Sequence, residues 1–396
     1  MKTVLFAWEL GGGLGHIGRM LPLAQSLADR GHRVVFVLRE LGQSAPIFAN
    51  RPFMVLQAPI WLGQLRNLPN SATYAEILFR QGFLAPEQLA GLVRSWRHLM
   101  DLVRPDLMIA DYAPTALLAA RALAFPVATY GSGFFAPPRT SPIPPFRTWE
   151  PIAATRVVES ERTALGSINR VQEMLGGKPL DRLADLFDVA ENFLCTVPEL
   201  DHYPQRQDAR YWNPVFGDIQ GAPAQWPAGE GRRVYAYLKP EHPGTTLLLD
   251  LLRAGNFRSL VYYPRVGTAP MPHGDAKNMV LSSRPLDITS LVKEADLAIC
   301  HAGVDTVYKC LLAGVPQLCL PMHAEQYITA MNVERLGAGI NIPADFKAPR
   351  FERALDKLAN DPGPRLGAEA FAKKYADQNP DADLAALVER CEELLR

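Results

Sequence analysis

The residues with the clearest chemistry lie along one predicted strand–helix–strand unit in the second half of the chain. The apolar run 295–300 predicts a buried strand, 303–313 a helix and 317–320 the next strand. A helix that begins at a strand end presents free backbone N–H groups and the positive end of its dipole, which suits a diphosphate without a metal ion. The candidate ligand-binding residues around this helix start are His301, Ala302, Gly303, Asp305 and Thr306, of which His301 and the hydroxyl of Thr306 could add hydrogen-bond donors.

A carboxylate and an amide follow the second of these strands. Glu325 and Gln326 come after its C-terminal end, the edge at which parallel α/β sheets bind ligands. Side chains of these two types can hold the vicinal hydroxyls of a sugar. A sugar diphosphate would then be bound at both ends, which makes a nucleotide-sugar transferase the leading hypothesis.

The spacing of this segment resembles the donor-binding signature of the GT-B glycosyltransferases, in particular the family 1 UDP-glycosyltransferases. A Pro precedes the His in that signature, at the position of Pro285, and an acidic residue and a Gln close it, at the positions of Glu325 and Gln326. The resemblance implies two Rossmann-like domains facing a central cleft, with a C-terminal helix that crosses back to the first domain. It also implies inverting, metal-independent sugar transfer from a UDP- or dTDP-linked donor, with no further cofactor.

Three positions depart from the family pattern in the part that binds the nucleoside. Ser283 replaces the Trp on which the donor base stacks, and Leu286 replaces the Gln after the motif's Pro. Lys309, which donates but cannot accept hydrogen bonds, replaces the Glu that binds the ribose hydroxyls. The nucleoside is therefore unusual or held by other residues, with Arg284 and Lys309 among the donor-binding candidates, or the protein is a non-catalytic sugar-nucleotide-binding protein.

A second constellation lies at the N-terminus, where residues 3–38 predict a strand, a glycine-rich loop over 11–18, a helix from Leu21 and another strand. Gly13 to Gly18 match the G-x-G-x-x-G dinucleotide fingerprint, and Glu40 falls about where a ribose-binding acid would stand. An NAD(P)- or FAD-dependent oxidoreductase is therefore the alternative function.

His16 lies inside this glycine-rich loop, where an imidazole can accept a proton near neutral pH. The stretch is similar to the start of the acceptor-binding domain in family 1 enzymes and in the lipid-II-forming N-acetylglucosaminyltransferases, and in the former this His is the general base. Asp111, after the predicted strand 107–110, is the expected carboxylate partner of His16. The alternatives are that Asp111 caps the following helix and that His16 only bonds locally. Gly15 is a further donor-binding candidate.

The acceptor site is expected on loops of the first domain. Trp61, Phe134 and Phe135 are its candidate residues, and their apolar character suits an aromatic, lipidic or natural-product alcohol. The alternative is that these rings simply pack in the core, which is the usual reason for burying aromatic side chains.

The predicted organisation has four parts. Residues 1–210 form the acceptor-binding Rossmann-like domain, 211–232 a Pro/Trp/Gly-rich linker, 233–375 the donor-binding Rossmann-like domain, and 376–396 the helix that packs back on the first domain. Lys239 follows the first strand of the donor domain, where the family often has a small Gly/Ser turn near the phosphates.

Composition sets the broad class. A chain of 396 residues with 48% apolar content has enough core-forming material for two domains. Lys+Arg and Asp+Glu are balanced at 41 each, which predicts neither nucleic-acid binding nor strong attraction to anionic membranes. The five cysteines show no metal-ligand spacing, and no apolar run resembles a signal peptide or a membrane span. These features favour a cytoplasmic monomer or homodimer without a metal site, for which peripheral membrane contact remains open.

Overall fold

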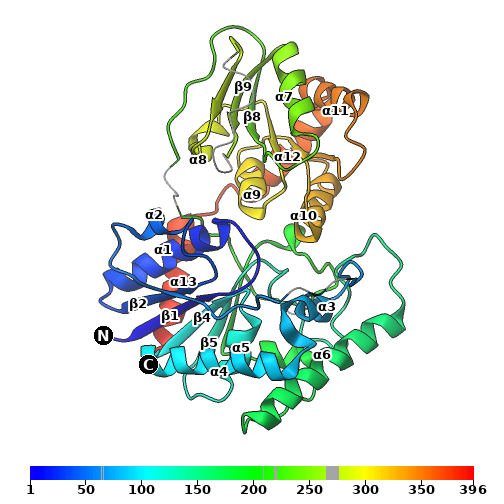
Figure 1. The fold of residues 1–396 in the computed structure, drawn as a ribbon. Coiled ribbons are helices and arrows are strands. Elements are labelled where there is room, and N and C mark those ends of the chain that lie inside the picture. Colours follow the sequence, from blue (N-terminus) through cyan, green and yellow to red (C-terminus); the bar gives the residue numbers. More distant parts are fainter. Residues whose placement is uncertain (64, 66, 208, 218–220, 265–275) are drawn as a thin grey trace. The chain divides into compact units, whose positions relative to one another are not determined.

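The chain forms two compact α/β units in a computed structural model that describes residues 1–63, 65, 67–207, 209–217, 221–264 and 276–396 (Figure 1). The first unit contains residues 1–217 and 379–396, and the second contains residues 218–378. Each is built on one parallel sheet, as predicted for the GT-B fold class. Residues 218–220 of the predicted linker lie outside the described residues.

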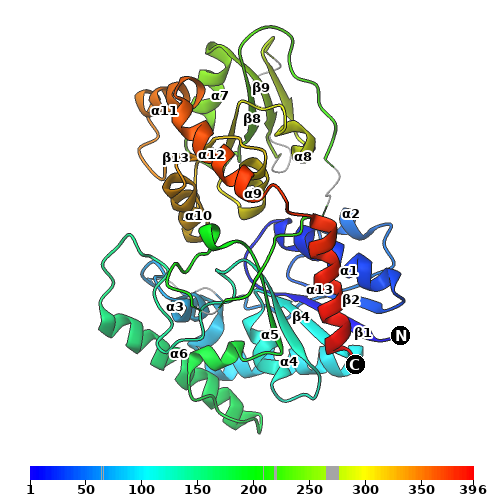
Figure 2. The same ribbon diagram turned by 180° about the vertical axis from the view of Figure 1, so that it is seen from behind.

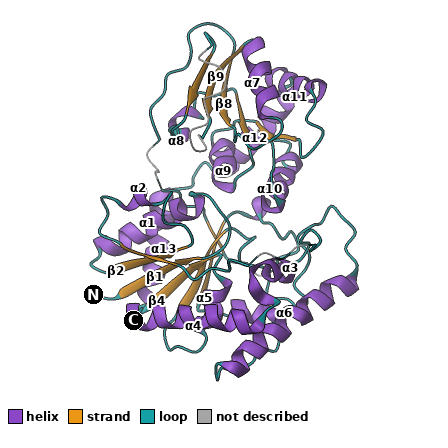
Figure 3. Cartoon of the chain, in the orientation of Figure 1, coloured by secondary structure: helices purple, strands orange, loops and turns teal. Residues whose placement is uncertain are grey.

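The first unit has a seven-stranded parallel sheet with the order β3-β2-β1-β4-β5-β6-β7. Figure 3 labels β2, β1 and β4 of this sheet. Its long strands are near-continuous apolar runs, because a parallel sheet is covered on both faces. The strands are β1 (Thr3–Trp8), β2 (Arg33–Leu38), β3 (Met54–Gln57), β4 (Leu107–Asp111), β5 (Val127–Gly131), β6 (Glu191–Cys195) and β7 (Tyr211–Trp212). The edge strand β7 lies inside the segment for which the sequence predicted a linker.

Helices of the first unit cover both faces of this sheet. They are α1 (Gly15–Asp29), α2 (Ala45–Phe48), α3 (Tyr74–Leu78), α4 (Pro86–Val103), α5 (Pro114–Ala120), α6 (Ala154–Met174) and α13 (Pro380–Leu394). Shorter helical turns are η1 (Phe79–Phe83), η2 (Leu183–Phe187) and η3 (Pro198–Leu200). Apolar residues of α1 and α13 share one buried cluster with alternate residues of β1, β2 and β4. No helix among the described residues has the length and hydropathy of a membrane span.

The C-terminal helix α13 packs on the first unit beside α1, although the residues before it in the chain belong to the second unit (Figure 2). Its apolar side joins the core through Leu387, Val388 and Cys391. Its polar side forms an ion pair at 2.8 Å between Arg390 and Glu191 and a hydrogen bond at 2.9 Å between His32 and Glu392. The predicted return of the last helix to the first domain is therefore confirmed.

The second unit has a six-stranded parallel sheet with the order β10-β9-β8-β11-β12-β13. Its strands are β8 (Arg232–Tyr237), β9 (Phe257–Tyr262), β10 (Met279–Ser282), β11 (Leu297–Cys300), β12 (Gln317–Cys319) and β13 (Gly339–Asn341). Its helices are α7 (Thr245–Ala254), α8 (Ile288–Leu291), α9 (Val304–Leu312), α10 (Ala324–Arg335), α11 (Ala348–Asn360) and α12 (Pro362–Lys374). One apolar cluster joins α7 and α11 to this sheet, and another joins residues of α8 and α9 to it.

Helix α1 differs from the prediction because it begins at Gly15, whereas the sequence pattern predicted a loop as far as Gly18. The helix contains Pro22, which has no N–H to donate to the carbonyl of Gly18. The backbone N–H of Gly217 donates to that carbonyl instead, at 3.1 Å. A Cβ at position 217 would lie 2.5 Å from the same oxygen and 3.1 Å from Cδ of Pro22, so only glycine fits there.

We predict that Gly217→Ala lowers the free energy of unfolding by roughly 1–3 kcal/mol, because the added methyl group displaces the backbone donor that replaces the one Pro22 lacks. Urea denaturation followed by circular dichroism measures the change. Gly91→Ala is the control, because a Cβ at that position in α4 meets no atom within 4 Å. It should stabilise by about 0.5–1 kcal/mol. Equal midpoints for the Gly217→Ala and wild-type proteins would contradict the packing argument.

Candidate functional site

His16 and Asp111 meet at the C-terminal edge of the first sheet. His16 lies in the first turn of α1 and Asp111 is the last residue of β4, and Nδ1 of His16 is 2.9 Å from Oδ2 of Asp111. The Asp111 side chain is 0% exposed and that of His16 is 7% exposed. An ionised carboxylate can only accept, so Nδ1 is the donor of this bond, and in the neutral form of the ring Nε2 then has a lone pair. This is the arrangement in which a carboxylate orients an imidazole base.

Aromatic rings surround the imidazole of His16. The ring of Trp8 stacks on it with centroids 5.1 Å apart and planes at 20°, and the ring of Phe135 lies 5.0 Å away. Tyr112, which has a positive φ of 48°, lies 6.4 Å away on centroids. At Gly11, which has a φ of 83°, a Cβ would lie 2.6 Å from Nε2 of His16. The glycine-rich loop therefore makes room for the ring as well as turning the chain.

Asp111 does not cap helix α5, which was the alternative role for it. The N-terminus of α5 is capped by Glu9, whose Oε2 accepts from the backbone N–H of Thr115 at 2.8 Å and of Ala116 at 3.4 Å. Glu9 follows β1, is 1% exposed, and is held through its backbone carbonyl by Arg39 at 3.1 Å. Burial raises the pKa of the Glu9 carboxyl to about 7, although the bonds from Thr115 and Ala116 lower it.

In the second unit, the start of α9 is open to a ligand. Gly303 is the N-cap of α9, and a Cβ there would meet no atom within 4 Å. Ala302 before it is buried and has a φ of 55°, which turns the chain from β11 into the helix. Asp305 lies in the first turn of α9, and Thr306 follows it at a half-buried position. Free N–H groups at such a helix start can bind an anion.

His301 lies before α9 as predicted, but its ring forms hydrogen bonds other than the one that the sequence suggested. Its Nε2 accepts the backbone N–H of Lys239 at 2.8 Å, so Nδ1 must carry the proton that it donates to the carbonyl of Leu320 at 2.9 Å. Burial, reinforced by His242 and Lys239, lowers the pKa of His301 to about 4. Both nitrogens of this neutral ring are occupied, so His301 ties the loops after β8 and β12 to the start of α9 rather than offering a donor to a diphosphate.

Of the other predicted donor residues, Arg284, Glu325 and Gln326 follow strand ends at the same edge of the second sheet, and Lys309 lies further along α9. Lys309, in the last turn of α9, donates from Nζ to Oγ1 of Thr289 at 3.2 Å. Glu325 and Gln326 begin α10, and Oε1 of Gln326 accepts the N–H of Met322 at 2.9 Å. The exposed Arg284 follows β10. Gly15, in contrast, belongs to the first unit, where it begins α1.

The candidate acceptor residues separate in the structure. Phe135 contacts His16, and Phe134 packs on Tyr112 with centroids 6.3 Å apart. Both phenylalanines are buried. Trp61 instead lies against Gly82 of η1, where an added Cβ would be 2.6 Å from its ring. The structure therefore places Phe135 against His16 and Phe134 next to Phe135, away from Trp61.

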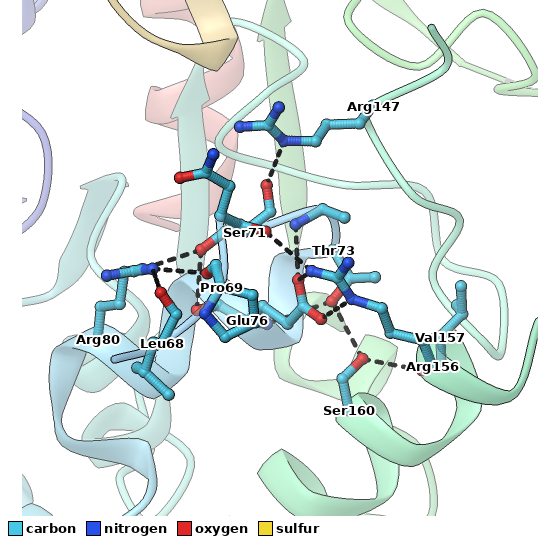
Figure 4. A network of polar contacts seen from close by, with 12 residues as sticks. Leu68, Pro69, Ser71, Thr73, Glu76, Arg80, Arg147, Arg156, Val157 and Ser160 are labelled. Carbon is cyan, nitrogen blue, oxygen red and sulfur yellow. Dashed lines mark hydrogen bonds and ion pairs between the residues drawn. The ribbon is translucent and has the colours of Figure 1, made fainter. Parts of the chain in front are cut away.

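A polar network fixes the segment before α3 to helix α6 (Figure 4). Arg156 donates from Nε to Oε1 of Glu76 at 2.6 Å and from a terminal nitrogen to Oε2 at 2.9 Å. The same carboxylate accepts the backbone N–H of Ala72 at 2.6 Å. A bidentate pair of this kind fixes geometry as well as adding energy, so the chain before α3 is held at a defined place.

Sequence reasoning missed Trp8, Glu9, Gly11 and Tyr112. No sequence pattern singled out Trp8, and Glu9 had no partner nearby in the sequence. The signal that could have found them is their position, because residues that follow the parallel strands β1 and β4 must share one edge of the sheet.

We predict that Glu9 makes stability depend on pH. Because its pKa is raised in the folded protein, the contribution of Glu9 to stability is fully present below the unfolded value of 4.5 and is lost as the pH rises through about 7. The free energy of unfolding of Glu9→Gln minus that of the wild type should therefore rise by about 3 kcal/mol between pH 4.5 and 8. Urea titrations of both proteins across this range measure it, and a pH-independent difference would contradict the raised pKa.

Comparisons with known proteins match the chain over both units. Residues 277–394 match the family described as erythromycin biosynthesis protein CIII-like, C-terminal domain. The PGL/p-HBAD biosynthesis rhamnosyltransferase of Mycobacterium bovis (strain BCG / Pasteur 1173P2) is 24% identical over 384 residues, which cover 91% of this chain and 82% of that protein. The NDP-glycosyltransferase YjiC of Bacillus licheniformis is 38% identical over 73 residues, and the match spans only 18% of either chain.

Solved structures show the same fold. The glycotransferase of kitacinnamycin superposes with a TM-score of 0.71 at 16% identity, covering 100% of this chain and 99% of that one. The spinosyn rhamnosyltransferase SpnG complexed with thymidine diphosphate gives 0.64 at 19% identity, covering 98% and 100%. The predicted resemblance is confirmed, and the oxidoreductase alternative is not retained. The chain therefore has the GT-B fold of these glycosyltransferases, and its residues 277–394 match the EryCIII-like C-terminal domain.

Proposed function

We propose that this enzyme transfers a sugar from a UDP- or dTDP-linked donor to a hydroxyl group of a small aromatic, lipidic or natural-product acceptor, with inversion at the anomeric carbon and without a metal ion. The observation that carries the proposal is the buried hydrogen bond between His16 and Asp111, because it leaves Nε2 of His16 as a base. A non-catalytic sugar-nucleotide-binding protein would not need this pair.

In the proposed reaction, Nε2 of His16 removes the acceptor proton as the acceptor oxygen attacks the anomeric carbon. The bond from that carbon to the diphosphate oxygen breaks, and the nucleoside diphosphate leaves with the electron pair. Asp111 stabilises the imidazolium that forms. A single displacement of this kind inverts the anomeric carbon.

The backbone at the start of α9 is the proposed binding site for the departing diphosphate. Preorganised N–H groups aimed at developing negative charge commonly stabilise a transition state more than any other feature of an active site. Gly303 leaves this helix start accessible. Glu325 and Gln326, at the start of α10, are the proposed contacts for the sugar hydroxyls.

Known relatives support the donor and acceptor classes. One solved relative is a spinosyn rhamnosyltransferase in complex with thymidine diphosphate, and another structure of it contains the spinosyn aglycone. The mycobacterial relative is also a rhamnosyltransferase. We therefore place dTDP-linked deoxysugars first in a donor screen, beside UDP-sugars, with phenolic and lipidic alcohols as acceptors. Product analysis by NMR tests inversion, and turnover in EDTA tests metal independence.

We predict that His16→Ala lowers kcat by roughly 10²–10⁴-fold, because it removes the general base, while donor affinity stays unchanged. Asp111→Asn should also lower kcat, because it removes the charge that stabilises the imidazolium. Single-turnover kinetics and calorimetric titration with the nucleoside diphosphate measure the two effects. Unchanged turnover in His16→Ala would exclude this assignment of the base.

We also predict that Gly11→Ala lowers kcat on the order of 100-fold, because the new methyl group would stand 2.6 Å from Nε2 of His16 and displace the ring. Gly12→Ala is the matched control, since a Cβ at Gly12 meets nothing within 4 Å. It should leave kcat within a few-fold of the wild type. Equal activities for the two variants would show that Gly11 does not set the position of the base.

A further inference from the structure

Two tyrosine rings are stacked where β8 and β9 end. Tyr237 and Tyr262 are register partners at the C-terminal ends of these neighbouring parallel strands, so their side chains share one face of the sheet. Their ring centroids are 4.9 Å apart and their planes are inclined by only 17°. Both residues are partly exposed. A stacked aromatic pair at the ligand-binding edge of a parallel sheet differs from rings that are wholly buried in a core.

Tyr237 connects the tyrosine pair to the start of α9, and Tyr262 lies one strand further away. The ring of Tyr237 meets the ring of His301 edge to face, with centroids 5.7 Å apart and planes at 82°. His301 stands just before the turn into α9, where the diphosphate is proposed to bind. In a nucleoside diphosphate the ribose separates the base from the phosphates. The rings of His301, Tyr237 and Tyr262 contact one another in this order, so Tyr262 lies farther from the start of α9 than His301 does. The base of a bound nucleotide would likewise lie farther from the start of α9 than its phosphates.

The residues beside Tyr262 on the next strand are small. Ser282 of β10 is its register partner, and the exposed Ser283 follows. Ser283 occupies the position at which the glycosyltransferase signature has a base-stacking Trp, so the chain lacks that ring and has a tyrosine pair one strand away. Aromatic faces stack on any nucleobase, because every base has a π-face.

We propose that Tyr262, supported from beneath by Tyr237, is the stacking surface for the nucleobase of the donor. This inference rests on the proposed function, and it names the residues that replace the missing Trp. Burial raises the pKa of both phenols, so the hydroxyl groups stay neutral and can donate to base oxygens or nitrogens. Lys309, which is held by Thr289, then needs no role in base stacking.

The experiment is calorimetric titration of the full chain with UDP, dTDP, GDP and inorganic diphosphate. For the nucleoside diphosphate that binds the wild type best, Tyr262→Ala should raise Kd by roughly 5- to 150-fold, the range expected for removing one base-stacking ring. Its Kd for inorganic diphosphate should not change, because that ligand has no base. Tyr262→Phe should keep the nucleotide affinity within a few-fold, since the ring is retained.

Tyr263→Ala is the matched control, because this neighbouring ring packs with the apolar cluster on the opposite face of the sheet. It should leave the ratio of nucleotide to diphosphate affinity unchanged. A Tyr262→Ala protein that binds the nucleotide as tightly as the wild type would overturn the stacking assignment. A parallel loss of affinity for inorganic diphosphate would also overturn it, because the ring would then act on the whole site. A wild type that binds none of the nucleotides would instead contradict the proposed function.

Discussion

The hydrogen bond between His16 and Asp111 depends on the register of two parallel strands. Trp8 of β1 is the register partner of Asp111 of β4, and the Trp8 ring stacks on His16. A slip of one residue in this pairing would turn the Asp111 side chain to the other face of the sheet. The apolar residues of β1 and β4 that fix the register are therefore as necessary for this hydrogen bond as Asp111 itself. The packing of the first unit's core thus also sets the positions of His16 and Asp111.

In the second unit, a buried histidine likewise connects neighbouring strand ends, but its hydrogen bonds are to backbone groups. His301 joins three strand ends, because it follows β11 and bonds to the backbone after β8 and after β12. Its lowered pKa keeps it neutral, and a neutral imidazole can accept at one nitrogen and donate at the other. A protonated ring would have no acceptor for the N–H of Lys239. Burial of His301 thus holds the C-terminal edge of this sheet in one arrangement.

Much of the fold followed from the sequence, because apolar runs bounded by Gly and Pro mark buried parallel strands and the helices between them. The pairing of His16 with Asp111 followed as well, since both were expected at one sheet edge. The start of α1 at Gly15 did not follow from the sequence. Pro22 cannot donate to the carbonyl of Gly18, and the donor that replaces it, the N–H of Gly217, lies far along the chain. The cap of α5 is the distant Glu9 rather than the nearby Asp111, and no local pattern indicated it. Local sequence patterns cannot show that a backbone group is hydrogen-bonded by a residue far away in the sequence.

The division between backbone and side-chain recognition explains why one part of the donor signature is intact and another is not. A diphosphate bound by N–H groups at the start of α9 requires a turn and an open helix end, which Ala302 and Gly303 provide. A nucleobase requires a ring, and a ring can be supplied from any strand that ends beside it. Ser283 therefore does not by itself indicate a degenerate site. The stacked tyrosines at the ends of β8 and β9 could compensate for the ring that is missing after β10. The backbone N–H groups of a helix start, in contrast, cannot be supplied by a side chain from another strand.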